Sequence, residues 1–539
     1  MRYGKHFSSK ATPQSEPIPG STQVENSAGG FSWAVDDWVR LDRFLVLGSE
    51  GGTYYTSEKK LTKENAGAVL RCINQDGPRV VSRIVEISDA GRAPKNDPAI
   101  FALAMAAGLG TARTKQVALD ALPKVCRIGT HLFHFAEAVQ EFRGWGRGLR
   151  RAIGKWYLEK LPDYVAFQAI KYRQRDGWTH RDLLRLAHPK ASSEEFQRVL
   201  HWIVKGTLAT DQPSTKADAI LAGFEELQAV ATPEQAATII YKYGLPREAV
   251  PTEMLNFPVV WEALASEFMP YTAMIRNLAT MTRVGLLTPL GAHTKQICAR
   301  IIDEKRLKGS RTHPVGILAA LMTYSQGKGM RGQHTWTPVP EIIDALDRAF
   351  YLSFGNVTPT GKRMVLALDV SSSMDGGTVS GVPGLTPRVA SAAMALVTAA
   401  VEKSSVMVAF TTRMVELKIT ARTRLDDAVA AMQALPFGGT DCSLPMKWAL
   451  DLGVNADAFV ILTDSETWAG SSHPVQALRT YRASRNIPAK FIVVGMVSNE
   501  FTIADPNDAG MMDCVGFDTA TPDLISSFVR GDLLGKGGK

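Results

Sequence analysis

Oxygen-bearing side chains cluster at three places in the last third of the sequence. Asp369, Ser371 and Ser373 form a D-x-S-x-S motif that begins at the end of the apolar run MVLALD. Thr440 follows two glycines, and Asp464 follows a second apolar run, AFVIL, and one threonine. Oxygen donors without accompanying histidine or cysteine suit Mg²⁺, which keeps several of its waters when a protein binds it. The three clusters therefore predict a site for one divalent cation, Mg²⁺.

A second cluster has the residue types that bind nucleic acid. The densest basic stretch, KYRQRDGWTHRDLLRLAHPK, runs from Lys171 to Lys190 and interleaves cations with aromatic and imidazole rings. Arginine and lysine neutralise phosphates, and such rings stack on unpaired bases. The alternative is an amphipathic helix whose leucines are core and whose charges are only solvated. On chemistry alone, the candidate RNA contacts in this segment are Arg173, Gln174, Thr179, His180 and Arg185.

The elements that position the oxygen clusters follow from the hydrophobic pattern of residues 361–539. Apolar runs of strand length at Met364–Asp369, Ser405–Phe410, Ala458–Leu462 and Phe491–Val494 alternate with helical segments. Such alternation predicts an α/β domain with a parallel, doubly wound sheet. Ligands of open α/β sheets bind outside the carboxyl ends of the strands, which is where all three oxygen clusters fall.

The preceding region is predicted to be helical. From Phe31 to Phe354, apolar residues recur with helical spacing, and capping boxes and glycines mark where helices begin and end. Helices of about 12–16 residues joined by tight turns predict an irregular α-solenoid. The Ser-, Pro- and Gly-rich start of the chain predicts a flexible arm. The predicted domains are residues 1–28 (flexible arm), 29–360 (helical) and 361–539 (α/β).

Composition excludes several classes of protein. The five cysteines are scattered and form no C-x-x-C pair, which excludes a disulfide framework and a thiolate zinc cluster. No apolar stretch is long enough to span a bilayer, and the N-terminus lacks the apolar core of a signal peptide. We therefore expect a soluble, cytoplasmic protein without a membrane partner.

Charge is distributed unevenly between the two regions. Residues 361–539 carry 16 basic and 18 acidic residues, whereas residues 1–360 carry 45 basic and 35 acidic residues, a net charge of +10. The asymmetry favours a polyanionic partner for the helical region. A solvated basic surface without a partner is the alternative.

Long segments resemble the Ro ribonucleoprotein autoantigen family, in the order that this family has them. They are the basic segment 171–190, MPYTAMIRNLATMT at 269–282, PTGKRMVLALDVSSSM at 359–374, GGTDCSLPMKWA at 438–449 and GMVSNEFTIADP at 495–506. The resemblance extends from about Gly29 to the C-terminus. It implies a mixed multidomain fold: a TROVE module of HEAT-like helical repeats closed into a monomeric ring, and then a Rossmann-like von Willebrand factor A domain.

The resemblance implies roles for the oxygen clusters. They match the metal-ion-dependent adhesion site of von Willebrand factor A domains, in which Ser371, Ser373 and Thr440 would touch the metal. Asp369 and Asp464 would act largely through bound water. One coordination position would stay open for an acidic group of a ligand.

For RNA, the resemblance implies that Lys171, Arg175 and His188 lie at the RNA surface. Members of the family bind small noncoding Y RNAs on the outer basic surface and pass single-stranded 3′ ends of misfolded RNAs through the central hole. Bacterial members cooperate with exoribonucleases such as polynucleotide phosphorylase. The resemblance thus implies a role in RNA quality control, decay or processing. The oxygen cluster has no placed nucleophile or base, so we expect a protein that is not an enzyme.

Two other functions compete with this interpretation. One is a metal-dependent protein-adhesion scaffold, in which the helical region is an ordinary solenoid. The other is a metal-dependent nuclease, which lacks the clustered carboxylates of a two-metal site. The charge asymmetry favours RNA, because an adhesion scaffold gains nothing from excess positive charge on its helices.

Overall fold

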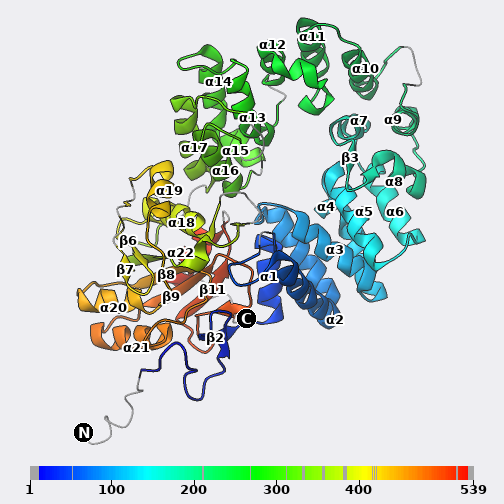
Figure 1. Ribbon diagram of the computed structural model, residues 1–539. Helices are drawn as coiled ribbons and strands as arrows, with labels where there is room; N and C mark the ends of the chain where they lie inside the picture. Colours follow the sequence, from blue (N-terminus) through cyan, green and yellow to red (C-terminus); the bar gives the residue numbers. More distant parts are fainter. Residues whose placement is uncertain are drawn as a thin grey trace, which may run out of the picture.

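The computed structural model describes residues 11–531, apart from 51, 209–211, 267–268, 311, 330–333, 355–357, 380–384, 416, 418, 421 and 518–519. Two regions differ in architecture: a helical region that extends to Ser353 and an α/β domain that begins at Met364 (Figure 1). Within the described ranges, no helix is both long and apolar enough to cross a membrane.

The helical region consists of short helices packed in rows. Helices α2, α4, α6 and α8 contact one another in succession, and α3 packs on α5 beside them. The bounds are α1 Asp37–Leu47, α2 Glu58–Ala90, α3 Asp97–Leu109, α4 Ala112–Val125, α5 Gly129–Phe142, α6 Arg147–Leu158, α7 Pro162–Lys171, α8 His180–Ala187, α9 Glu194–Lys205, α10 Lys216–Gln228, α11 Pro233–Tyr243, α12 Pro258–Leu264, α13 Tyr271–Arg283, α14 Ala292–Ile301, α15 Glu304–Ser310, α16 Pro314–Ser325 and α17 Pro340–Ser353.

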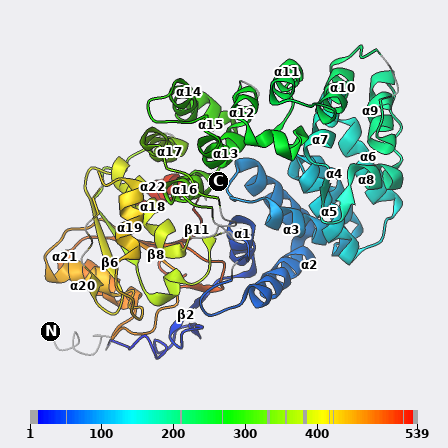
Figure 2. The same ribbon diagram turned by 45° about the horizontal axis from the view of Figure 1, so that its top comes forward.

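Both ends of the helical array rest on the α/β domain. Helix α1 contacts strand β11 (Met511–Val515), and α16 contacts helix α19 (Leu425–Gln433). Figures 1 and 2 show the helices between them following a curved path away from that domain and back. The described elements therefore form a closed circuit. The predicted fold class, a helical-repeat region followed by an α/β domain, is confirmed.

The α/β domain contains a six-stranded sheet in the order β11-β9-β8-β5-β6-β7. All neighbouring strands are parallel except the β6–β7 pair at one edge. All six residues of β5 and of β8 are buried, as expected for central strands covered on both faces. The bounds are β5 Met364–Asp369, β6 Ser405–Phe410, β7 Met414–Val415, β8 Ala458–Thr463, β9 Lys490–Gly495, and helices α18 Pro387–Val401, α20 Leu444–Asp451, α21 Pro474–Arg485 and α22 Thr521–Arg530.

The prediction of a flexible arm over residues 1–28 is wrong for residues 11–28; residues 1–10 lie outside the described part. Strands β1 (Val24–Glu25) and β2 (Phe31–Ala34) form a small antiparallel sheet with β10 (Phe501–Thr502) of the α/β domain. Gln14 is fully buried, and Trp33 packs in the core of the α/β domain. A few anchoring contacts thus outweigh the Ser- and Pro-rich composition that favours a flexible arm.

A buried arginine joins the two regions. The Arg43 side chain on α1 is fully buried, and its Nη2 lies 2.8 Å from both carboxylate oxygens of Asp513 on β11. Its Nη1 donates to the backbone oxygens of Asn499 and Phe501, each at 2.8 Å. The ion pair and the bonds of Nη1 and Nη2 make burial of this guanidinium tolerable, although its buried Nε has no hydrogen-bond partner among the described residues; loss of Arg43 or of Asp513 would leave the other charge uncompensated.

We expect Arg43→Ala to lower the free energy of unfolding by about 3–5 kcal/mol, because it leaves the Asp513 carboxylate without its ion-pair partner. Arg71→Ala is the matched control: it breaks the exposed Arg71–Asp37 pair and should cost no more than about 1 kcal/mol. Denaturant unfolding followed by intrinsic fluorescence measures both. Equal small losses would show that Arg43 does not hold the regions together.

Candidate metal centre and nucleic-acid interface

The three oxygen clusters converge at one edge of the sheet. Asp369 is the last residue of β5, Asp464 directly follows the neighbouring strand β8, and Thr440 lies in the loop before α20. Ser372 N donates to the Gly438 carbonyl at 3.0 Å, which ties the D-x-S-x-S loop to the glycines before Thr440. Residues that are far apart in the sequence are therefore neighbours, as the parallel topology predicts.

Hydrogen bonds fix the orientation of these side chains. The Asp369 carboxylate accepts from Ser371 N at 2.9 Å and from the Thr463 hydroxyl at 2.6 Å. The hydroxyl oxygens of Ser371 and Ser373 lie 3.1 Å apart. Asp464 accepts from Glu466 N at 3.0 Å. The loops thus hold hydroxyl and carboxylate oxygens in one compact set.

Negative charge in this set has little compensation. Burial raises the pKa of Asp369 and of Asp464, and burial likewise raises the pKa of Glu466 to about 7. A nearby cation is Arg388, whose fully buried guanidinium donates to the Val370 carbonyl at 2.6 Å. Buried carboxylates that are short of positive charge favour a bound cation.

The donor set fits a hard divalent cation. Ser371, Ser373 and Thr440 offer hydroxyl oxygens, and Asp369 and Asp464 can act directly or through water. Among the described residues, no group of three or more histidine, cysteine, aspartate or glutamate side chains is arranged to hold a metal ion. A cation at this edge of the sheet therefore depends on the hydroxyls.

Two residues beside the five candidates also shape this centre. Glu466 belongs to the polar run after β8, and its signal is in the sequence, as the second carboxylate of TDSE. Tyr55 comes from the loop between α1 and α2. Its hydroxyl lies near the Ser373 side chain, and burial together with the Asp464 and Glu466 carboxylates raises its pKa. No local sequence signal connects Tyr55 to the D-x-S-x-S motif.

If Mg²⁺ binds here, it should raise the melting temperature of the wild type and not that of Asp369→Ala or Thr440→Ala. Both substitutions remove one oxygen donor each and leave the apolar residues of the sheet unchanged. Ser372→Ala is the control, because among the described residues the Ser372 side chain bonds only the Gly438 carbonyl, at 3.3 Å. Thermal unfolding with Mg²⁺ and with EDTA measures the difference. An equal response to Mg²⁺ in all four proteins would remove the assignment.

The basic segment folds as a helix end, a hairpin and a second helix. Helix α7 ends at Lys171, β3 (Gln174–Arg175) pairs with β4 (Trp178–Thr179), and α8 follows. Lys171 and Arg175 therefore do not lie on one continuous helix. Asp176 and Gly177 have φ values of 50° and 77°, the positive pair of a tight hairpin turn, which ends the helical path.

The candidate RNA contacts do not all lie on the surface. Arg173, Gln174, Arg175, Arg185 and His188 are exposed. Lys171 is half-buried, with its ammonium 5.4 Å from the ring of Tyr172.

Two candidates have structural roles instead. Thr179 is the N-cap of α8: its hydroxyl accepts from Asp182 N at 3.2 Å, and the Asp182 carboxylate accepts from Thr179 N at 3.0 Å, which together form a capping box. His180 is buried, and its Nδ1 lies 2.7 Å from the Tyr157 hydroxyl. The prediction that His180 is a surface contact is wrong, because the apolar face of α8 includes it.

Burial lowers the pKa of His180 to about 4, well below its ordinary value. In the unfolded chain this imidazole takes up a proton near pH 6.5, whereas the folded protein takes it up only near pH 4. Stability should therefore fall as the pH drops from about 6.5 towards 4, by up to about 3 kcal/mol from this group. Denaturant unfolding at several pH values should show a smaller loss in His180→Gln. An identical pH profile would mean that the pKa of His180 does not differ between the folded and the unfolded chain.

A basic face on α6 completes the surface. Arg147, Arg150, Arg151 and Lys155 are exposed at helical spacing on this helix, in the segment RGLRRAIGK. Within the described residues, Lys155 pairs with Glu159, but no carboxylate lies within 4 Å of the three arginines. A Cβ on Gly154 would lie 3.6 Å from the Pro189 side chain, so this face adjoins the end of α8. The basic spacing within RGLRRAIGK is the sequence signal for this face, which lies outside the densest basic stretch.

Comparison with known proteins defines the class. The TROVE domain family matches residues 24–323, and the Ro60 vWA domain family matches residues 363–529. The chain is thus a TROVE protein with a C-terminal von Willebrand factor A domain.

Relatives over the full length define the family. The chain is 41% identical to the RNA-binding protein RO60 of Deinococcus radiodurans over 97% of this chain and 98% of that protein, and 38% identical to the RNA-binding protein RO60 of Caenorhabditis elegans over 95% and 90%. The crystal structure of the Deinococcus radiodurans RO (RSR) protein matches with a TM-score of 0.70, at 41% identity, over 92% of this chain and all of that one. The chain belongs to the Ro60 family.

Proposed function

We propose that this protein binds RNA through the surface formed by α6, the β3–β4 hairpin and α8. The observation that carries the proposal is the group of exposed arginines there that have no carboxylate within ion-pair distance among the described residues: Arg147, Arg150, Arg151, Arg181 and Arg185. Some arginines elsewhere on the helical region, such as Arg71 and Arg83, are instead paired with aspartates. Unpaired guanidinium groups on adjoining helices attract phosphates.

The surface also offers groups that can contact bases. His188 is exposed at the end of α8, where its backbone adopts the left-handed conformation. Gln174 and Arg175 are exposed on the hairpin. Imidazole, amide and guanidinium groups hydrogen-bond to base edges and stack on unpaired bases, which suits a structured RNA with loops more than a regular duplex.

The RNA partner in this proposal is a small noncoding Y-like RNA on the outer surface, and single-stranded 3′ ends of misfolded RNAs would use the centre of the helical circuit. RNA quality control, in the cytoplasm and together with an exoribonuclease such as polynucleotide phosphorylase, would then be the cellular role. The names of the relatives support the RNA partner, and the unpaired arginines support the surface. A protein-adhesion scaffold fits less well, because the candidate metal ligands are buried.

Replacing Arg150 and Arg151 by Ala, or Arg181 and Arg185 by Ala, should weaken binding of a Y-like stem–loop RNA by about 1–3 kcal/mol per strong contact. A titration against salt should show log K falling linearly with log salt and a smaller slope in both variants. The matched control is Lys403→Ala, an exposed cation of the α/β domain that should leave affinity unchanged. Unchanged RNA affinity in both arginine variants would show that RNA does not bind at this surface.

The triple variant Lys171→Ala, Arg175→Ala and His188→Ser distinguishes specific from general binding. If the hairpin contacts structured RNA, a Y-like RNA should lose more affinity than a single-stranded 3′ tail in a direct competition. Equal losses would mean that both RNAs share one basic surface. Circular dichroism should be unchanged, because none of these side chains is fully buried.

A further inference from the structure

The candidate metal centre is enclosed. Each of its five candidate ligands, Asp369, Ser371, Ser373, Thr440 and Asp464, is at most 3% exposed. A metal site that grips a carboxylate of another protein needs an approach from solvent to its open coordination position. Whatever covers these residues therefore decides whether such a partner can reach the metal.

One cover is the segment Gly52–Ser57 of the helical region. Thr53 forms a β-bridge with Gly377, and the Tyr54 backbone lies on Gly376. Between these contacts and α2, Tyr55 places its hydroxyl against Ser373 and in the field of the Asp464, Glu466 and Asp369 carboxylates. The approach is so close that a Cβ on Gly376 would lie 2.5 Å from the Tyr54 Cβ, so only glycine fits.

A second cover is the segment before β2. Gln14 donates to the Asp441 carboxylate at 2.7 Å, next to Thr440. Asn26 donates to the Thr467 carbonyl at 2.8 Å, and Ser27 N donates to the Glu466 carboxylate at 2.8 Å. These bonds fix the two loops that carry Thr440 and Asp464.

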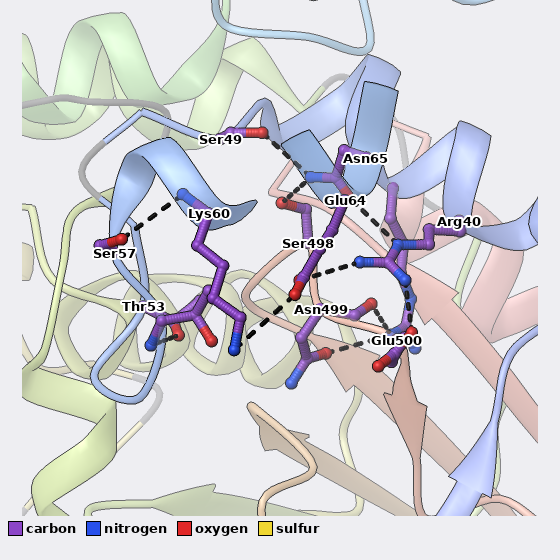
Figure 3. A network of polar contacts seen from close by, with 12 residues as sticks. Arg40, Ser49, Thr53, Ser57, Lys60, Glu64, Asn65, Ser498, Asn499 and Glu500 are labelled. Atoms are coloured by element: carbon purple, nitrogen blue, oxygen red, sulfur yellow. Dashed lines mark hydrogen bonds and ion pairs between the residues drawn. The ribbon is translucent and has the colours of Figure 1, made fainter. Parts of the chain in front are cut away.

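The base of the first cover is anchored by the polar network in Figure 3. Asn65 on α2 donates to the hydroxyls of Ser49 and Ser498, at 3.0 and 3.2 Å, and accepts from Arg40 at 3.1 Å. Asn499 in turn donates to the Asp464 carbonyl at 2.8 Å and to the Glu466 carboxylate at 3.1 Å. The network connects the helix that follows Tyr55 to the strand end that carries Asp464.

We propose that Tyr55 closes the metal centre from within the chain, so that the centre joins the helical region to the α/β domain and does not dock an outside acidic partner. The hydroxyl of Tyr55 occupies the approach that a partner's carboxylate would use, and the Gly376 contact holds it there. This inference rests on the metal centre proposed above. It makes Tyr55 a positioning residue of that centre, supplied by the other domain.

The test uses the full-length protein, Mg²⁺ and a short peptide with one aspartate as the carboxylate probe. Calorimetric titration should show little binding to the wild type. Two variants should bind the peptide at least about tenfold more tightly, a change of about 1.4 kcal/mol: Tyr55→Ala, and Gly376→Ala, which pushes the segment away and leaves the side chains of Tyr55 and of the five candidate ligands unchanged. Binding should disappear in EDTA. Lys59→Ala, an exposed residue on α2, is the control and should behave as the wild type.

The outcomes separate this inference from the metal assignment. If the wild type binds the peptide as tightly as Tyr55→Ala does, and only with Mg²⁺ present, the proposal that Tyr55 closes the centre is wrong and the metal assignment stands. Peptide binding by neither variant, although Mg²⁺ raises their melting temperatures, would also overturn it. No effect of Mg²⁺ on any protein would remove the metal centre and the closure together. If Tyr55→Ala does not fold, Tyr55→Phe and Gly376→Ala decide the result.

Discussion

The architecture depends on burying a guanidinium between two domains. Arg43 is the point at which the first helix of the array meets the sheet, and it satisfies the Asp513 carboxylate together with two backbone carbonyls. A buried charge must keep its partners, since a shift of α1 would separate the Arg43 guanidinium from the Asp513 carboxylate and from the two carbonyls. The pair therefore fixes the angle at which the helical array leaves the α/β domain. The direction of the following helices depends on that angle, up to α16, which contacts α19 of the α/β domain.

Local sequence rules predict most of the elements but not their joints. The alternation of apolar runs and helical segments predicts β5, β6, β8 and β9, because central strands are almost wholly apolar. The rule does not predict strand β11, which lies at the edge of the sheet. Its apolar run is interrupted by Asp513, a residue that pairs with Arg43 of the other domain. The ordered segment before β2 is not predicted for the same reason, since its anchors are long-range partners.

The two candidate sites divide in the same way. The five oxygen donors could be identified from the sequence because each one sits at a strand or helix end of a single domain, where topology brings the ends together. Tyr55 could not be identified, because only the packing of one domain on the other brings it to Ser373. In the basic segment, residue types predict charge correctly but not exposure. His180 and Arg185 belong to the same helix, and their positions on its two faces decide that His180 is buried and Arg185 is exposed.

The pairing of β2 with β10 has a consequence for how the chain is made. Phe501 and Thr502 are synthesised long after Trp33 and Ala34, their partners in the sheet. Contacts of such large sequence separation slow folding, because the entropy of closing the loop is lost before the contacts form. Until the ribosome has delivered the last strands, Trp33 has no core to enter and remains an exposed aromatic side chain on an unpaired strand. The nascent protein thus carries an aggregation-prone end for almost the whole of its synthesis, which a holding chaperone would need to cover.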